Sequence, residues 1–103
     1  MKSPFTHKVI EIIAAIPSGK VTTYGIIAAH ANNKRGARQV ARILHSSSAK
    51  YDLPWHRVVN RNGKISLKPG YGYERQIKML MEEGIVFDEL ERIDFSEYLW
   101  WPR

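Results

Sequence analysis

The sequence predicts a mostly helical α+β domain that carries one small β-hairpin. Apolar residues recur at helical spacing in four segments. The second and third segments are short and are joined by a tight turn that contains glycine, which is typical of a helix-turn-helix. The run Asn60-Arg61-Asn62-Gly63 follows them, and Asn-Gly is a strong hairpin signal. Because such a hairpin would be the wing of a winged helix, we expect one winged helix-turn-helix domain over residues 1–103.

The first helix is predicted to begin at Ser3-Pro4, where serine can cap a helix and proline fits its first turn. It is predicted to end near Pro17-Ser18-Gly19. The apolar residues that recur at helical spacing between these signals are Phe5, Val9, Ile12, Ile13 and Ile16.

The second and third helices form the helix-turn-helix candidate. Val21-Thr22-Thr23 is a short extended link, and either threonine can cap the helix that follows. The second helix is predicted from Tyr24 to about Ala31, and the third from Ala37 to about Ser46. The apolar face of the third helix consists of Val40, Ile43 and Leu44. A basic stripe lies opposite that face, as expected of a helix that faces a groove of nucleic acid, and it consists of Arg38, Arg42 and His45.

The second half of the chain contains the hairpin, one more helix and an aromatic tail. The hairpin is predicted from His56 to Leu67, and the fourth helix from Tyr73 to Glu83 with Gly84 as its stop. Ile77, Leu80 and Met81 are predicted to point inward. The tail contains too many aromatic residues to be left in water, so we expect it to fold back onto the body.

Composition excludes several kinds of site. The chain has no cysteine, which excludes disulfides, thiolate metal sites and a cysteine nucleophile. The four histidines are scattered without ligand spacing, so we expect no metal and no cofactor. The apolar runs are too short to span a membrane, and the amino-terminal residues do not lead into a signal peptide. We therefore expect a monomeric cytoplasmic protein, in the bacterial cytosol and associated with the nucleoid when bound to DNA.

Charge is distributed unevenly along the chain. The net charge of +6 results from a middle segment, residues 34–68, with a net charge of +8, and a carboxyl-terminal segment, residues 74–103, with a net charge of −4. A neutral ligand gives no reason for such a middle segment, whereas a polyanion does, because each neutralised phosphate releases counterions. A solvated basic face that maintains solubility is the alternative.

Five motifs resemble a known family in their order and spacing: "IPSGKVTTYGIIA", "ARQVARIL", "LPWHRVV", "GKIS" and "EEG". The family is that of the O6-alkylguanine-DNA alkyltransferases, and the resemblance to its carboxyl-terminal DNA-binding domain covers nearly all of residues 4–101. In that family the central motif is Pro-Cys-His-Arg, and the cysteine takes the alkyl group from the damaged base. Here Trp55 stands at the cysteine position, which is typical of the alkyltransferase-like proteins.

The resemblance implies a role for each matching residue. Tyr24 would press on a backbone phosphate, Arg38 would enter the base stack, and Trp55 would form part of the pocket wall. His56 matches the histidine that activates the cysteine, and Glu83 matches its acidic partner. The predicted contacts with DNA and the damaged base are Tyr24, Arg38, Arg42, Pro54, Trp55, His56 and Lys68. The predicted phosphate or wing contacts are Thr23, Lys34, Arg35, Ser47, Arg61 and Lys64.

These features predict a sensor of O6-alkylguanine that flips the base without repairing it, because an indole does not attack an alkyl carbon as a thiolate does. Double-stranded DNA and nucleotide excision repair proteins are the expected partners. One alternative is an enzyme in which His56 and Glu83 activate water for dealkylation or base removal. A second is a plain winged-helix regulator that reads sequence. Without the resemblance, residues such as Trp55 and Tyr24 are more often packing residues than ligand contacts. His56 would then be a buried structural histidine bonded to the backbone, and Arg38 would be a solvated charge.

Overall fold

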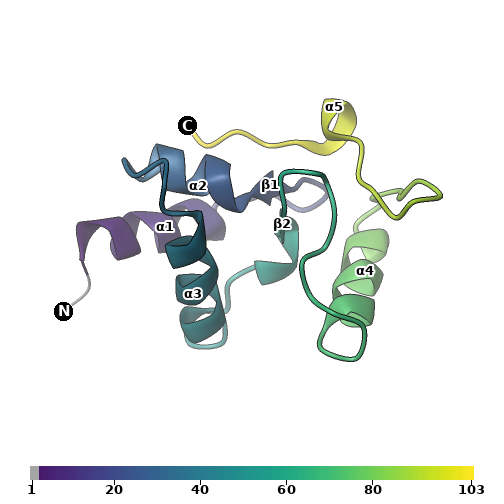
Figure 1. Cartoon of the computed structure of the whole chain (residues 1–103), viewed down its shortest axis with the longest axis horizontal. Coiled ribbons are helices and arrows are strands. Elements are labelled where there is room, and N and C mark those ends of the chain that lie inside the picture. Colours follow the sequence, from purple (N-terminus) through teal and green to yellow (C-terminus); the bar gives the residue numbers. More distant parts are fainter. Residues whose placement is uncertain (1–2) are drawn as a thin grey trace.

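The computed structural model describes residues 3–103, which are mostly helical (Figure 1). The helices are α1 (Pro4–Ala14), α2 (Tyr24–His30), α3 (Ala37–Ser47), the 3-10 helix η1 (Trp55–Arg57), α4 (Tyr73–Glu82) and α5 (Phe95–Tyr98). The strands are β1 (Thr22–Thr23) and β2 (Val58–Val59). Among these residues, none of the helices is both long enough and apolar enough to cross a membrane.

The two strands pair in parallel and separate two apolar cores. Thr22 is paired with Val58, and Thr23 with Val59. Val58 belongs to the core formed by α1, α2 and α3, whereas Val59 belongs to a second core beside α4 and the tail. Successive side chains of a strand point to opposite faces, so these two valines join the halves of the molecule.

Local signals placed the helices correctly. The side chain of Ser3 caps α1, and that of Thr23 caps α2. Gly84 has a φ of +92° just after the end of α4, as expected for a glycine that stops a helix. One predicted inward residue was wrong, because Met81 is 60% exposed. Helices η1 and α5 were not predicted.

The predicted hairpin over residues 56–67 is not formed, although its turn is. The N–H of Asn60 donates to the carbonyl oxygen of Lys64, which closes the turn. Before the turn, Val58–Val59 pair with β1 rather than with residues 64–67. After it, the carbonyl oxygen of Gly63 accepts from the N–H of Ile93 in the tail. The predicted wing is therefore a loop, and the sheet is parallel, while the class of a mostly helical domain with a small sheet is confirmed.

The aromatic tail folds back onto the body, as predicted. Leu99 forms a bridge with Val21, and the N–H of Trp100 donates to the carbonyl oxygen of Val21. Trp100 packs on the first core, and the Trp101 ring lies 6.4 Å from the ring of His30 in α2. Figure 1 shows this segment running from α5 back across α2.

Candidate nucleic-acid interface

Helix α3 presents its basic stripe to solvent. Its Val40 and Leu44 are buried in the first core. On the opposite side Arg38, Arg42 and His45 are exposed, and within residues 3–103 the two arginines make no ion pair. Long, unpaired cationic side chains on one helix face can reach phosphates or base edges without first breaking an internal contact.

The start of α2 holds Tyr24 in a fixed position. The side-chain oxygen of Thr23 accepts from the N–H of Ile26 at 3.1 Å and so caps the helix. The Tyr24 ring is half-buried and packs against the first core. Burial raises the pKa of the Tyr24 hydroxyl, and a hydrogen bond with Ser66 partly offsets this. The hydroxyl is therefore neutral at physiological pH and does not repel a phosphate.

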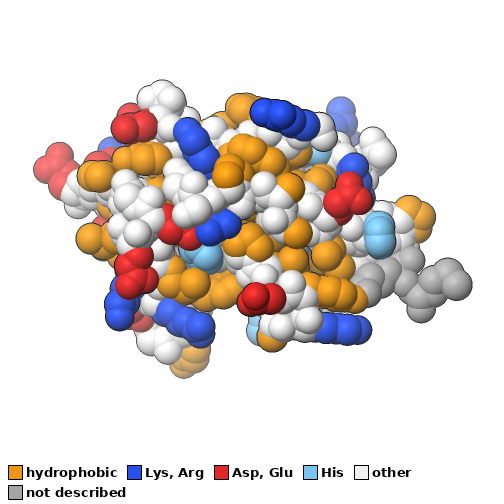
Figure 2. Space-filling model, turned by 180° about the vertical axis from the view of Figure 1, so that it is seen from behind, with side chains coloured by type: hydrophobic (Ala, Val, Ile, Leu, Met, Phe, Trp, Pro, Cys, Tyr) orange, Lys and Arg blue, Asp and Glu red, His pale blue; other side chains and the backbone are white. Residues whose placement is uncertain are grey.

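The predicted phosphate contacts differ in exposure. Lys34, Arg35, Arg61 and Lys64 are exposed, the first two in the turn before α3 and the last two in the turn after β2. Lys68 is also exposed. Thr23 and Ser47 are buried, so only a change in structure would bring these two side chains to a phosphate. Figure 2 shows blue Lys and Arg side chains around a broad apolar area on the back of the molecule.

Helix η1 carries Trp55, His56 and Arg57, and Glu83 at the end of α4 binds two of them. The Nε2 of His56 lies 2.6 Å from Oε2 of Glu83. The Nε of Arg57 donates to both carboxylate oxygens at 3.0 and 3.1 Å, and its Nη2 donates to Oε2 at 2.7 Å. The backbone N–H of Gly19 also donates to Oε1 at 3.0 Å. We call these four groups the Glu83 clamp: His56, Arg57, Glu83 and Gly19.

The clamp sets the charge of Glu83 and the position of η1. Burial alone would raise the pKa of the Glu83 carboxyl, but the hydrogen bonds from Arg57, His56 and Gly19 outweigh it and lower the pKa to about 2. Because Glu83 is an anion, the Nε2 of His56 carries the proton in their bond. Arg57 also donates to the carbonyl oxygen of Ile16 at 2.8 Å, and this bond joins η1 to the segment that follows α1.

The predicted pairing of His56 with Glu83 is thus present, and the partner of the buried His56 is a carboxylate rather than the backbone. The Nδ1 of His56 is buried and has no hydrogen-bond partner in the described part of the chain. Sequence reasoning missed Arg57 and Gln76. The buried side chain of Gln76 donates to the carbonyl oxygens of His56 and Val58 at 3.0 and 3.1 Å. The only sequence signal that could have indicated Arg57 was the glutamate of the "EEG" motif, because a buried glutamate needs a cationic partner.

A cavity of about 710 Å³ lies beside Trp55. Three predicted site residues, Pro54, Trp55 and His56, line it, whereas Tyr24 and Lys68 do not. The guanidinium of Arg75 also lines it and lies 5.7 Å from the centre of the Trp55 ring, a cation–π distance. Among residues 3–103, no group of three or more His, Asp or Glu side chains is placed to hold a metal ion.

The family described as 6-O-methylguanine DNA methyltransferase, DNA binding domain, matches residues 4–85 of this chain. The chain belongs to this family. It is 46% identical over 96 residues to the DNA base-flipping protein of Escherichia coli, a match that covers 93% of this chain and 74% of that protein. It is 34% identical over 82 residues to the methylated-DNA–protein-cysteine methyltransferase of Salmonella typhimurium, covering 80% of this chain and 47% of that enzyme.

Two solved structures of the family have similar folds. One is Atl1 from Schizosaccharomyces pombe in complex with damaged DNA containing O6-carboxymethylguanine, with a TM-score of 0.83 and 36% identity. That match covers 99% of this chain and 100% of the other. The second is the O6-methylguanine methyltransferase of Mycobacterium tuberculosis, with a TM-score of 0.65 and 27% identity over 81% of this chain and 50% of that chain. The resemblance to the alkyltransferases and the mostly helical fold are thereby confirmed.

Proposed function

We propose that this protein is a non-enzymatic sensor of DNA damage, which binds O6-alkylguanine in duplex DNA and flips the base into a pocket beside Trp55. One observation carries the proposal: the Glu83 clamp is complete, while the position before His56 holds tryptophan instead of a nucleophile. Relatives in the family are named for base flipping, and one was solved on damaged DNA. Both facts support DNA carrying an alkylated base as the ligand.

Trp55 would hold the alkylated base without reacting with it. The indole N–H is only a donor, and the whole chain has no cysteine to accept an alkyl group. The ring is half-buried and offers apolar surface to the neighbouring cavity. Aromatic contact contributes about 1–3 kcal/mol per stacked base, which is enough to favour a base that contacts Trp55 over one that does not.

Arg38 would fill the gap that the flipped base leaves. It lies exposed in the first turn of α3, and its planar guanidinium can both stack on bases and donate hydrogen bonds. Arg42, one turn further along the same face, would contact a phosphate. Tyr24 would press its phenol on the phosphate next to the damaged nucleotide. Flipping costs a few kcal/mol, and less for a damaged pair that already bonds poorly, which would favour lesions.

A protein that binds a lesion and leaves it in place needs a second activity to remove it. We therefore propose that the bound complex flags the lesion for nucleotide excision repair, and that the protein acts as a monomer in the cytoplasm. Residues 1–103 would form a single DNA-binding domain.

The enzyme alternative is disfavoured by the clamp. A general base must be free to take a proton, but the two oxygens of Glu83 already accept hydrogen bonds from three groups. A carboxyl whose pKa is about 2 is also a weak base. The regulator alternative predicts preference for one DNA sequence and indifference to damage.

Titration of two duplexes by fluorescence anisotropy tests the proposal. The duplexes differ only in one O6-methylguanine, and each is measured at two salt concentrations. We expect tighter binding to the lesion duplex, quenched tryptophan emission, and an unchanged mass of both DNA and protein after incubation. Equal binding to both duplexes would favour the regulator, and a change in the mass of the lesion strand would favour the enzyme.

A further inference from the structure

Residues 81–97 expose an apolar surface that the proposed DNA contacts do not use. Met81, Val86 and Leu90 are 60%, 69% and 58% exposed. Met81 and Val86 line a shallow cavity at the end of α4 together with Phe87. Exposed apolar side chains that share a cavity, as Met81 and Val86 do, are typical of a surface that contacts another molecule.

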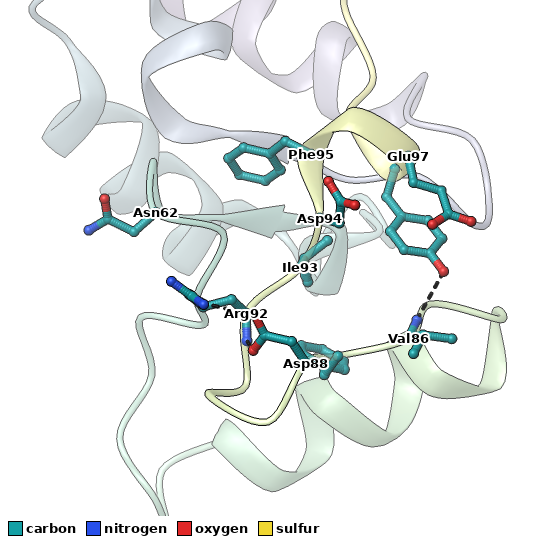
Figure 3. A pocket seen from close by; sticks show the side chains of 10 residues that line it. Asn62, Val86, Asp88, Arg92, Ile93, Asp94, Phe95 and Glu97 are labelled. Carbon is teal, nitrogen blue, oxygen red and sulfur yellow. Dashed lines mark hydrogen bonds and ion pairs between the residues drawn. The ribbon is translucent and has the colours of Figure 1, made fainter.

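A larger cavity of about 550 Å³ adjoins this surface and shares Val86 and Phe87 with it (Figure 3). Its apolar walls include Phe95 and Tyr98, and the hydroxyl of Tyr98 accepts from the N–H of Val86 at 3.3 Å. Asp94 and Glu97 also line it, as do Arg92 and the Asp88 carboxylate that already neutralises Arg92. The cavity therefore combines aromatic rings with carboxylates, which together suit a cationic side chain.

The charge of this region is strongly negative. Residues 81–97 contain seven acidic residues and one basic residue, Arg92. Glu83 is held in the clamp, and Asp88 is paired with Arg92 at 3.0 Å. Within residues 3–103 the exposed carboxylates of Glu82, Glu89 and Glu97 make no ion pair. Figure 2 shows Asp and Glu side chains gathered at one margin of the molecule.

A surface with this charge repels DNA, whereas the unpaired cations of α3 and the turn before it attract DNA. The acidic surface would thus stay free while the basic surface holds the duplex. We propose that the acidic apolar surface, made of Met81, Val86, Phe87, Asp94, Phe95, Glu97 and Tyr98, binds a protein partner through a segment that carries arginine or lysine next to apolar side chains. The cation would enter the aromatic cavity, and the apolar neighbours would cover Met81 and Val86.

The inference deepens the proposed function, because it names the surface by which a sensor bound to DNA would recruit a second protein. Its test begins without DNA, so the peptide titration gives a result even if the protein does not bind lesion DNA and the proposed function fails. The probe is a short synthetic peptide of alternating arginine and leucine, titrated into ¹⁵N-labelled protein. Control peptides replace arginine by glutamate or leucine by serine.

We expect chemical shift changes confined to the amides of residues 81–98, and about tenfold weaker binding for each control peptide. Val86→Ser with Glu97→Gln should weaken the arginine–leucine peptide about tenfold as well. These two side chains are exposed, so the fold should be retained. The matched control is Leu67→Ser with Glu11→Gln, which changes an exposed apolar residue and an exposed acid outside the surface and should bind the peptide normally.

The Val86→Ser, Glu97→Gln variant should bind duplex DNA with the affinity of the wild type within about twofold, because the acidic surface is proposed to stay free of DNA. Three outcomes would overturn the proposal. They are shifts that map to residues 34–68, equal binding of the glutamate–leucine peptide, or weaker binding of duplex DNA by the Val86→Ser, Glu97→Gln variant. Sedimentation velocity distinguishes a second copy of the chain as the occupant: a dimer that the Val86→Ser, Glu97→Gln variant abolishes would replace the hetero-partner with self-association.

Discussion

Replacing Glu83 by glutamine should reduce stability in a manner that depends on pH. The pKa of the Glu83 carboxyl is lowered from 4.5 to about 2 in the folded protein, because hydrogen bonds from Arg57, His56 and Gly19 outweigh its burial. Since one pKa unit corresponds to about 1.4 kcal/mol, the ionised carboxylate stabilises the folded state by about 3 kcal/mol. Because the folded pKa lies below the unfolded one, this stabilisation is complete above pH 4.5 and disappears as pH falls toward 2.

Glu83→Gln should therefore lose about 3 kcal/mol of unfolding free energy at pH 7, where the donors of Arg57 and His56 face a neutral amide. Near pH 2 to 3 the wild-type carboxyl becomes protonated too, so the gap between the two proteins should narrow to about 1 kcal/mol. Urea unfolding followed by tryptophan fluorescence at a series of pH values measures the gap. Glu82→Gln is the matched control, because the neighbouring Glu82 is exposed and makes no ion pair in the described residues.

A gap that stays constant from pH 7 to pH 3 would refute the reasoning. It would mean that Glu83 stabilises the fold by shape alone and that its charge is not held by the clamp. Equal stability of Glu83→Gln and Glu82→Gln at pH 7 would refute it as well.

Four further substitutions test the proposed interface and the loop after β2. In anisotropy titrations, Arg38→Ala should weaken binding to lesion DNA more than binding to plain DNA. Lys64→Ala should weaken binding to both equally and reduce the slope of the salt dependence by about one. Equal losses of affinity for Arg38→Ala would contradict its role as a wedge in the base stack. Trp55→Ala should reduce the lesion-to-plain affinity ratio about tenfold or more, and an unchanged ratio would place the base elsewhere. Gly63→Ala should lower the melting temperature, because Gly63 has a φ of +73° and an added Cβ would lie 2.6 Å from the carbonyl oxygen of Ile93. A melting temperature equal to that of wild type would contradict this.

The sequence predicted those parts of the fold that depend on neighbouring residues. Capping by Ser3 and Thr23 and the stop at Gly84 are local, and each helix that they bound was predicted to within three residues. The parallel pairing of Val58–Val59 with Thr22–Thr23 joins segments far apart along the chain. An Asn-Gly pair reports only that the chain turns there, so it could not reveal that the preceding strand has a distant partner.

The charge pattern predicted the interface only in part. Arg57 counts among the nine cations of residues 34–68, yet Glu83 neutralises it, so it adds nothing to an attraction for DNA. The sequence also failed to predict the exposure of the apolar side chains of Met81 and Val86, because helical spacing predicted Met81 to be buried. For Arg57 the missing information was a partner distant in sequence, and for Met81 it was that α4 turns Gln76 and Leu80 inward instead.

The clamp explains how a chain can lose the reactive residue of a motif and keep the rest. Arg57 binds both Glu83 and the carbonyl oxygen of Ile16, so it joins η1 to the end of α4 and to the segment that follows α1. Removing either Arg57 or Glu83 would leave the other partly buried without its ion-pair partner, which costs several kcal/mol. The Trp55 side chain takes no part in the clamp: it packs against the first core and lines the cavity. The motif is therefore held by the stability of the fold, and under the proposed function Trp55 uses its position for binding in place of chemistry.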